Sequence, residues 1–193
     1  MLALVGALAF SLVLGARRVF DRQSDWAERI EPASACLDGL VQDLACSLIP
    51  PEGKAPFFRL TADAEGSVLT CVTAGPPGED DPGGPLSRFR VWRVTWQLEP
   101  AAGGEEPALV RTAELERVSG EAVHKRYRLA GVTGFDVRVY DPAKREWVEK
   151  WETGRSGALP PAARAGLTVK TSRGSQMLST DTIIPAGMRI GPP

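Results

Sequence analysis

The first sixteen residues of the chain, MLALVGALAFSLVLGA, carry no charge and only one polar side chain, Ser11, before Arg17 and Arg18 end the apolar run. As an α-helix this segment would span about 24 Å of the roughly 30 Å hydrocarbon layer of a bilayer. A helix that is apolar on every face needs lipid or a large protein around it. We therefore predict a membrane-type helix. Its large apolar side chains, the candidates for contact with lipid or with partner helices, are Leu2, Leu4, Val5, Leu8, Phe10, Leu12, Val13 and Leu14.

Two other interpretations of this segment are weaker. A secretory signal peptide places basic residues before its apolar stretch and small residues at a cleavage site after it. Here no basic residue precedes the stretch, and both arginines follow it. A buried core helix would need a larger protein than 193 residues provide. We favour the membrane helix over both.

Residues 19–49 form a charged segment that predicts a second, amphipathic helix. Apolar side chains recur at i, i+3, i+4, i+7 and i+11, at Leu37, Leu40, Val41, Leu44 and Leu48. Pro32 should kink or restart this helix, with Ser34 available as a local cap, and Pro50 and Pro51 should end it. The apolar stripe needs a surface to pack on, and we expect that surface to be a sheet.

The rest of the chain consists of short segments rich in β-formers and separated by turns, which predicts an antiparallel sheet. Trp92, Val94, Trp96 and Leu98 alternate with polar residues, as a half-buried strand requires. Phe89 and Val91 are in the opposite phase, so a bulge or an edge twist near Val91 is expected to keep both groups buried. The predicted strands are 57–61, 67–73, 89–98, 109–115, 134–140, 146–151, 167–171 and 177–184.

Residues 135–151 predict a β-hairpin. Phe135, Val137 and Val139 alternate with polar residues, and 141–144, with the sequence DPAK, supply the turn. The five tryptophans are explained by core packing: Trp92 and Trp96 share one strand face, and Trp147 and Trp151 are predicted to share another. Two segments rich in glycine, proline and acidic residues, 75–85 and 100–107, predict surface loops.

Together these patterns predict an α+β chain in which a long N-terminal helix packs on an antiparallel β-sheet domain. With 193 residues, 43% of them hydrophobic, the chain can bury one core, so one globular domain is expected. We assign residues 1–50 to the N-terminal helix, membrane-type over 1–16 and amphipathic over 19–49, and residues 51–193 to the β-rich domain.

The charged residues carry no recognisable catalytic or metal site. The net charge of −1 provides no positive field for nucleic acid. His124, the only histidine, is followed by Lys125 and Arg126, which indicates an exposed position and not a catalytic base. Glu79, Asp80 and Asp81 could offer oxygens to Ca²⁺, but three adjacent acids without alternating ligand spacing are usually hydrated.

Glycines and cysteines are equally uninformative about chemistry. The pairs Gly83–Gly84 and Gly103–Gly104 lie among prolines and acids, which indicates turns and not phosphate loops. The cysteines have no CxxC spacing; Cys36 and Cys46 would lie roughly 15 Å apart on one helix, beyond disulfide reach. A bond from Cys71 to either one remains open beside buried free thiols. We expect no enzyme activity, no cofactor, no metal, and neither nucleic acid nor a small-molecule substrate as a ligand.

The order of these features resembles the minor pseudopilin J family of bacterial type II secretion systems. The family pattern has a strand followed by a "GV..F.VRYYD...W...W" hairpin and a "LP.AV...L.V" strand. In this chain the amphipathic helix ends in "LVQDLACSLIPP". The segments that correspond to the strand, the hairpin and the last strand are "RVWRVTWQLEP", "GVTGFDVRVYDPAKREWVEKW" and "ALPPAARAGLTVKT". The matching positions are Gly131, Val132, Phe135, Tyr140, Asp141, Trp147, Trp151, Leu159 and Pro160.

This resemblance implies a protein of the bacterial inner membrane whose β-rich domain faces the periplasm. It implies that the chain joins other minor pseudopilins, of the I and K types, at the pseudopilus tip where assembly starts. Such proteins carry a basic leader that a prepilin peptidase removes, and a glutamate inside the mature helix; the printed sequence contains neither. A start placed too late would explain this and the short apolar run.

Three functional hypotheses follow. The first is a minor pseudopilin. The second is a type IV pilus-like minor pilin or a membrane-anchored periplasmic binding module that holds a ligand through its loops. An anchored hydrolase is a third, and it would require a buried His124 beside a nucleophile.

Overall fold

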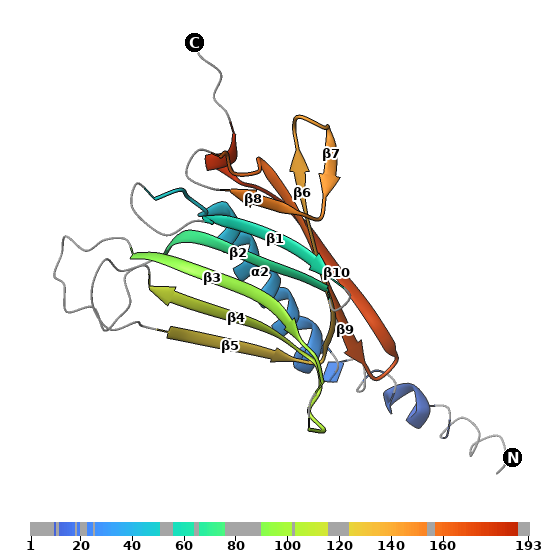
Figure 1. Ribbon diagram of the computed structural model, residues 1–193. Helices are drawn as coiled ribbons and strands as arrows, with labels where there is room; N and C mark the ends of the chain where they lie inside the picture. Colours follow the sequence, from blue (N-terminus) through green and yellow to red (C-terminus); the bar gives the residue numbers. More distant parts are fainter. Residues whose placement is uncertain are drawn as a thin grey trace, which may run out of the picture.

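The computed structural model shows an α+β fold in which a short helix packs on two antiparallel sheets (Figure 1). This confirms the predicted α+β class with a helix packed on antiparallel strands, whereas the strands form two sheets and the long N-terminal helix stays a prediction. The chain is described at residues 10, 12–17, 19, 23–24, 26–50, 56–63, 66–75, 90–101, 103–115, 124–153 and 157–188.

The larger sheet has six strands in the order β5-β4-β3-β2-β1-β8, and each neighbouring pair is antiparallel. Trp92, Val94 and Trp96 of β3 are buried on the face that meets the helix, as their alternation predicted. The strands are β1 (Phe58–Asp63), β2 (Gly66–Gly75), β3 (Arg90–Glu99), β4 (Ala108–Leu115), β5 (His124–Ala130) and β8 (Trp151–Thr153).

The smaller sheet has four antiparallel strands in the order β10-β9-β6-β7. It meets the larger sheet where β6 passes β2, and there the backbone amide of Val137 donates to the buried Ser67 hydroxyl at 2.9 Å. The strands are β6 (Val132–Asp141), β7 (Glu146–Val148), β9 (Ala162–Thr171) and β10 (Gly174–Ile183), and the short 3-10 helix η2 (Pro185–Gly187) follows.

The helical part consists of a π-helical turn, η1 (Trp26–Ile30), that runs directly into α2 (Glu31–Ala45). A proline ring excludes the carbonyl four residues before it, and for Pro32 this carbonyl belongs to Glu28, inside the wider π turn. Pro32 therefore marks the restart that the sequence predicted. Ser34 lies inside α2, whose N-cap is Ile30, so the prediction that Ser34 is the cap was wrong.

The helix also ends earlier than predicted, at Ala45 and not at Ile49. Residues 46–48, which follow the helix, pair with residues 72–74 of β2. They occupy the edge of β2 that β1 covers only as far as Cys71. There the amide of Leu48 donates to the carbonyl of Val72, and the amide of Ala74 donates to that of Cys46. These ladder bonds replace the last helical turn. Leu48 is thus in an extended segment and not on the helical stripe.

Tryptophans 147 and 151 do not share a strand face, which corrects the sequence prediction. The predicted strand 146–151 breaks after Val148: Trp147 pairs with Tyr140 in the smaller sheet, and Trp151 pairs with Leu60 in the larger one. The 141–144 turn of the hairpin is confirmed, since the Asp141 carboxylate accepts the amide of Ala143 at 2.9 Å. Trp147 packs edge-on against Tyr140, with 5.7 Å between the centres of the two rings.

Two further details of the sheets differ from the prediction. The ladder between β2 and β3 is regular from Arg90 to Gln97, so there is no bulge at Val91; Phe89 lies outside the described residues. The register shift occurs instead between Val132 and Gly134, where β6 meets β9.

One core fills the space between α2 and both sheets. Apolar side chains of α2 meet those of β1 to β4 and of β6 and β9, and α2 also contacts β10. The largest fully buried side chains include Trp96, Phe58, Leu40, Leu44, Leu69 and Leu167.

Helical backbone is also present at residues 12–17, which lie beyond the end of the domain (Figure 1). The uninterrupted described helix is η1 together with α2, so a helix continuous from residue 1 to the start of η1 stays a prediction. Among the described residues, no helix has both the length and the apolar character needed to cross a membrane. The division of the chain at residue 50 likewise stays a prediction.

Candidate functional site

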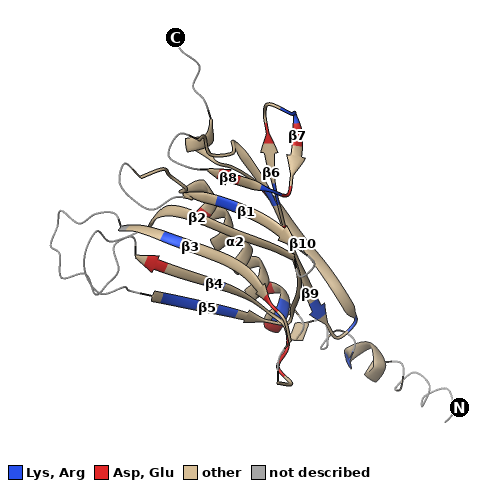
Figure 2. Ribbon diagram, in the orientation of Figure 1, with Lys and Arg blue, Asp and Glu red and all other residues tan. Residues whose placement is uncertain are grey.

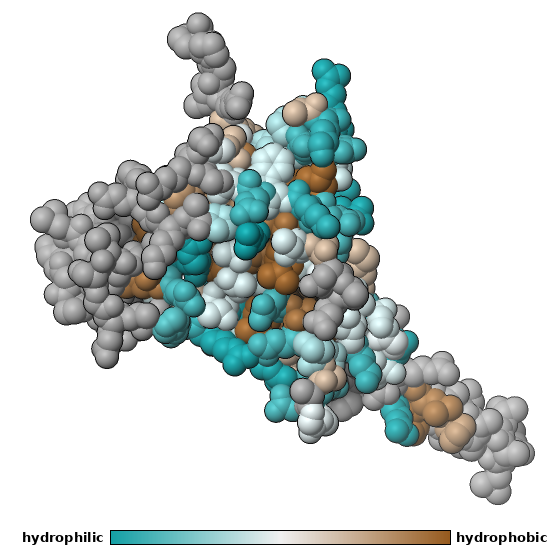
Figure 3. Space-filling model, viewed as in Figure 1, coloured by the Kyte–Doolittle hydropathy of each residue, from teal (hydrophilic) through white to brown (hydrophobic). Residues whose placement is uncertain are grey.

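The described part of the predicted membrane or assembly helix is exposed. The exposed fraction is 66% for Phe10, 73% for Leu12, 64% for Val13 and 40% for Leu14. The described helical segment near the N-terminus projects from the globular domain at the lower right of Figure 1, and Figure 3 shows brown, hydrophobic surface in the same place. Four of the predicted residues, Leu2, Leu4, Val5 and Leu8, lie outside the described residues.

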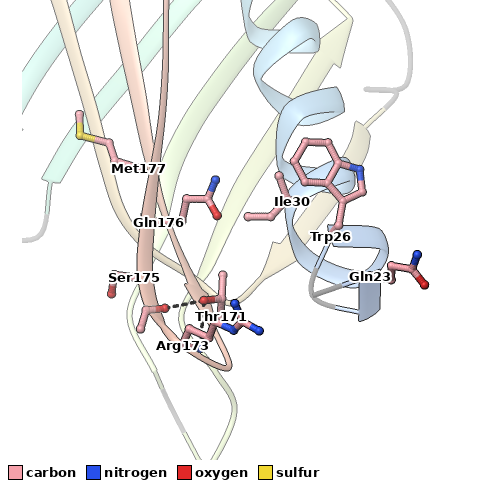
Figure 4. A pocket seen from close by; sticks show the side chains of 9 residues that line it. Gln23, Trp26, Ile30, Thr171, Arg173, Ser175, Gln176 and Met177 are labelled. Carbon is pink, nitrogen blue, oxygen red and sulfur yellow. Dashed lines mark hydrogen bonds between the residues drawn. The ribbon is translucent and has the colours of Figure 1, made fainter. Parts of the chain in front are cut away.

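A groove lies between η1 and the β9–β10 hairpin. It has a volume of about 890 Å³, with Trp26 and Ile30 on one side and Gln176 of the hairpin pointing toward them, while the Met177 side chain points away from them (Figure 4). Trp26 is 60% exposed, so the η1 side of the groove presents apolar surface to solvent. The base of the groove is polar. It consists of Gln23, Thr171, Arg173, Gly174, Ser175 and Gln176.

The hairpin wall of the groove is held in shape by its turn. The Thr171 hydroxyl donates to the carbonyl of Gly174 at 2.9 Å and accepts the amide of Arg173 at 3.3 Å. Gly174 has a φ of +124°, which glycine adopts without a Cβ penalty. The groove is therefore a formed feature of the fold. A wall of this kind can receive an apolar helix or an extended segment.

The residues predicted to pack the helix on the sheet fall into two groups. Leu37, Leu40 and Leu44 are buried in the core, with exposed fractions of 7%, 1% and 0%. Val41 and Leu48 are partly buried. The helix is thus fixed by one row of leucines.

The same row contains an acid that sequence reasoning missed. Asp43 is 7% exposed, and its carboxylate accepts three hydrogen bonds from the larger sheet. Arg111 Nε donates to Oδ2 at 2.8 Å, Arg111 Nη2 donates to Oδ1 at 2.9 Å, and Trp96 Nε1 donates to Oδ2 at 2.9 Å. The only signal in the sequence was an acid three residues after Leu40 and directly before Leu44.

This network is electrostatically matched. The hydrogen bonds to Asp43 raise the pKa of Arg111, although its partial burial opposes the shift. The Arg111 guanidinium also lies 5.8 Å from the centre of the Trp96 ring. A charge buried in this way is tolerated because every carboxylate oxygen has a partner. The network joins the end of α2 to β3 and β4.

The three cysteines are free thiols, and the two buried ones are not activated as nucleophiles. Cys36 and Cys71 are buried and Cys46 is exposed, and all three are free. Burial raises the pKa of the Cys71 thiol to about 12 and that of Cys36 to about 11. Since the thiolate is the reactive form, both buried thiols stay protonated at neutral pH. They serve as small core side chains, the more common of the two alternatives that the sequence left open.

Gly131, one of the residues that carry the family resemblance, has a structural role. It joins β5 of the larger sheet to β6 of the smaller one with a φ of +79°. A Cβ at this position would meet the guanidinium of Arg29, which donates to Glu106 at 2.7 Å. This hydrogen bond lowers the pKa of Glu106. The ion pair ties η1 to the loop that connects β3 with β4.

The structure brings no catalytic or metal constellation together among the residues it describes. His124 is exposed on β5, with its Nδ1 3.5 Å from the Glu114 carboxylate. No group of three or more histidine, cysteine, aspartate or glutamate side chains capable of holding a metal occurs in the described ranges. Glu79, Asp80, Asp81, Gly83 and Gly84 lie outside them. Gly103 and Gly104 form a turn, with φ values of +61° and +89°.

Comparison with known proteins identifies the family. A family model described as "Type II secretion system (T2SS), protein J" matches residues 9–179. A search of curated proteins found no match. The match includes the exposed helical residues, η1, the Asp43 network and every strand up to β9. It ends within β10, at residue 179. The chain therefore belongs to the type II secretion system protein J family, whose members are pseudopilins, structural components of the secretion system that interact with other pseudopilins.

Proposed function

We propose that this protein is a minor pseudopilin of the pseudopilus tip that helps to start assembly together with the I-type and K-type minor pseudopilins. In this proposal a helix runs continuously from residue 1 to the end of α2 at Ala45, and its first sixteen residues lie in the bacterial inner membrane. Residues 51–193 form the β-rich domain in the periplasm. The observation that carries the proposal is the exposure of Phe10, Leu12 and Val13 in a chain that belongs to this family.

Exposed apolar side chains on a helix require a partner. Burial of apolar surface is worth roughly 25 cal/mol per Å², so a row of uncovered large side chains favours transfer into lipid or against another helix. Lipid can hold this helix before assembly, and neighbouring pseudopilin helices can hold it in the filament. The work of such a subunit is association, which needs no group with an unusual pKa.

The groove between η1 and the β9–β10 hairpin is a feature of the globular domain that also supports the proposal. It is lined by Trp26, which is 60% exposed. Large aromatic side chains of this kind are enriched where proteins bind one another. In the proposal, the groove receives the helix of a neighbouring subunit as it leaves the membrane.

The test is secretion in a strain that lacks its own protein J. The full chain is expected to restore secretion of type II substrates, and Leu12→Glu is expected to reduce it at least tenfold, because a charge in an apolar helix opposes both membrane insertion and helix packing. Leu12→Ile is the matched control and should secrete like the parent chain. Membrane fractionation and protease access in spheroplasts should place the intact protein in the inner membrane, with its domain on the periplasmic side.

The proposal would be contradicted by normal secretion with Leu12→Glu at equal protein level. It would also be contradicted by a domain that protease reaches only from the cytoplasmic side.

A further inference from the structure

A second cleft lies away from the groove, between the C-terminal half of α2 and strands β2 to β5. It encloses about 330 Å³. We call it the basic cleft and define it by the six lining residues on which its chemistry depends: Gln42, Asp43, Thr73, Trp92, Arg111 and Lys125.

Lys125 is the cation that sets this cleft apart. It faces the inner side of the larger sheet, with its Nζ 5.6 Å from the centre of the Trp92 ring. No described carboxylate lies within ion-pair distance of it. Figure 2 shows that much of β5 is blue, the colour of lysine and arginine. The other basic side chains of this strand each lie within ion-pair distance of an acid. These pairs are His124 with Glu114, Arg126 with Glu99, and Arg128 with Glu105.

The cleft also contains a buried hydroxyl that lacks a hydrogen-bond partner. Thr73 is 3% exposed, and its Oγ1 has no partner among the described residues. Buried hydroxyls are normally satisfied, and one left unpaired costs free energy. Thr70, on the opposite face of the same strand, shows the usual arrangement: its hydroxyl pairs with that of Thr95 at 3.2 Å. An oxygen atom brought into the cleft would supply the missing partner.

The charges in the basic cleft indicate which kind of ligand group it can bind. Arg111 and Lys125 contribute two positive charges, and Asp43 contributes one negative charge that already binds Arg111 through two bonds. The cleft is therefore left with one uncompensated positive charge, at Lys125. The Trp92 ring beside it offers an apolar wall suited to methylene groups. A single carboxylate on a short aliphatic stem matches all three features.

We propose that the basic cleft binds a carboxylate, with Lys125 neutralising its charge, the Thr73 hydroxyl donating to one oxygen, and Trp92 covering the stem. The carboxylate can come from an acidic side chain of another pseudopilus subunit or from a free organic acid. The first source rests on the proposed function, and the second does not.

The cleft is tested directly with N-acetylglutamate as the probe and N-acetylglutamine as its uncharged counterpart. The full chain in detergent is labelled with ¹⁵N-tryptophan, which gives five indole resonances, one for each tryptophan. Trp92→Phe identifies the resonance of Trp92. At constant ionic strength, N-acetylglutamate is expected to shift this resonance saturably, and N-acetylglutamine is not.

Matched variants separate the cleft from general charge effects. Lys125→Met should weaken binding of N-acetylglutamate by about tenfold, the size of one charge-assisted hydrogen bond. Arg126→Met removes the same charge one residue away on the opposite face and should leave the affinity unchanged. Thr73→Val should also weaken binding by about tenfold without lowering the denaturation midpoint, because its hydroxyl makes no bond in the free protein. Thr70→Val should leave binding unchanged.

The proposal is overturned if the Trp92 resonance does not shift, if both probes shift it equally, or if Lys125→Met binds like Arg126→Met. The source is decided by adding the I-type and K-type minor pseudopilins to the labelled chain. If N-acetylglutamate no longer shifts Trp92 in the complex, the carboxylate is a partner's side chain. If it still does, the ligand is a free acid. Because the first titration contains no partner, its failure is distinguishable from failure of the proposed function.

Discussion

Replacement of Asp43 by alanine is expected to lower the free energy of unfolding by about 3 kcal/mol. The change removes three hydrogen bonds and leaves the Arg111 guanidinium and the Trp96 indole N–H unpaired against the core. A buried charge without its partner costs more than the pair contributed, which is why the effect should exceed that of an ordinary surface ion pair. Chemical denaturation of the full chain in detergent, followed by tryptophan fluorescence, measures it.

The chain contains a matched control for this experiment. Arg164 binds Asp181 through the same two-pronged geometry, at 2.8 and 2.9 Å, but on the surface, where both side chains are about half exposed. Asp181→Ala should therefore leave the denaturation midpoint nearly unchanged, since solvent screens such pairs. Equal effects of Asp43→Ala and Asp181→Ala would contradict this expectation, because they would show that burial adds nothing to the cost of breaking the Asp43 network.

Replacement of Leu40 by alanine is expected to cost about 3 to 4 kcal/mol. Leu40 is 1% exposed and lies in the row of leucines that fixes α2 on the sheets. Its truncation removes apolar contacts and leaves a cavity between the helix and both sheets, which a close-packed core cannot fill without moving backbone. The same denaturation experiment measures the loss.

Val41 provides the comparison, because it follows Leu40 on the same helix but is only partly buried. Val41→Ala should cost about 1 kcal/mol or less. If Leu40→Ala cost no more than Val41→Ala, the row of leucines would not be what holds α2 on the sheets. The two variants together thus test which side of the helix faces the core.

The parts of the fold that could be predicted from the sequence are those with regular apolar periodicity. Trp92, Val94 and Trp96 alternate because their strand is covered on one face only. The turn after Tyr140 was predictable because Asp141 bonds the backbone two residues on. The α+β class followed from combining a 3.6-residue stripe with two-residue alternation.

The strand β5 was not predicted from the sequence, and the reason is physical. Six of its seven residues are exposed, so its side chains carry no apolar alternation that would reveal a strand. Its membership of the sheet depends on backbone pairing with β4. The break between Trp147 and Trp151 was equally hidden, because both tryptophans fit a single strand in sequence and only tertiary pairing separates them.

One of the candidate sites could be predicted from the sequence, and the other two could not. The apolar N-terminal segment could be recognised from composition alone, since sixteen uncharged residues are rare outside membranes and large cores, and its described residues Phe10, Leu12, Val13 and Leu14 are exposed. The Asp43 network joins residues 68 positions apart in the chain, and the basic cleft requires Thr73 and Lys125 to come together from two different strands. Such pairings are properties of the fold and leave no local pattern in the sequence.

Association with other pseudopilins is the activity on which the proposed function depends. It can be measured, separately from secretion, by sedimentation velocity of the full chain in detergent, alone and mixed with the I-type and K-type minor pseudopilins of the same system. We expect a faster-sedimenting complex that contains all three proteins in fixed proportion and that Leu12→Glu weakens at least tenfold. If the chain sediments unchanged beside folded partners at every concentration tested, it does not act by joining them, and the proposed function is wrong.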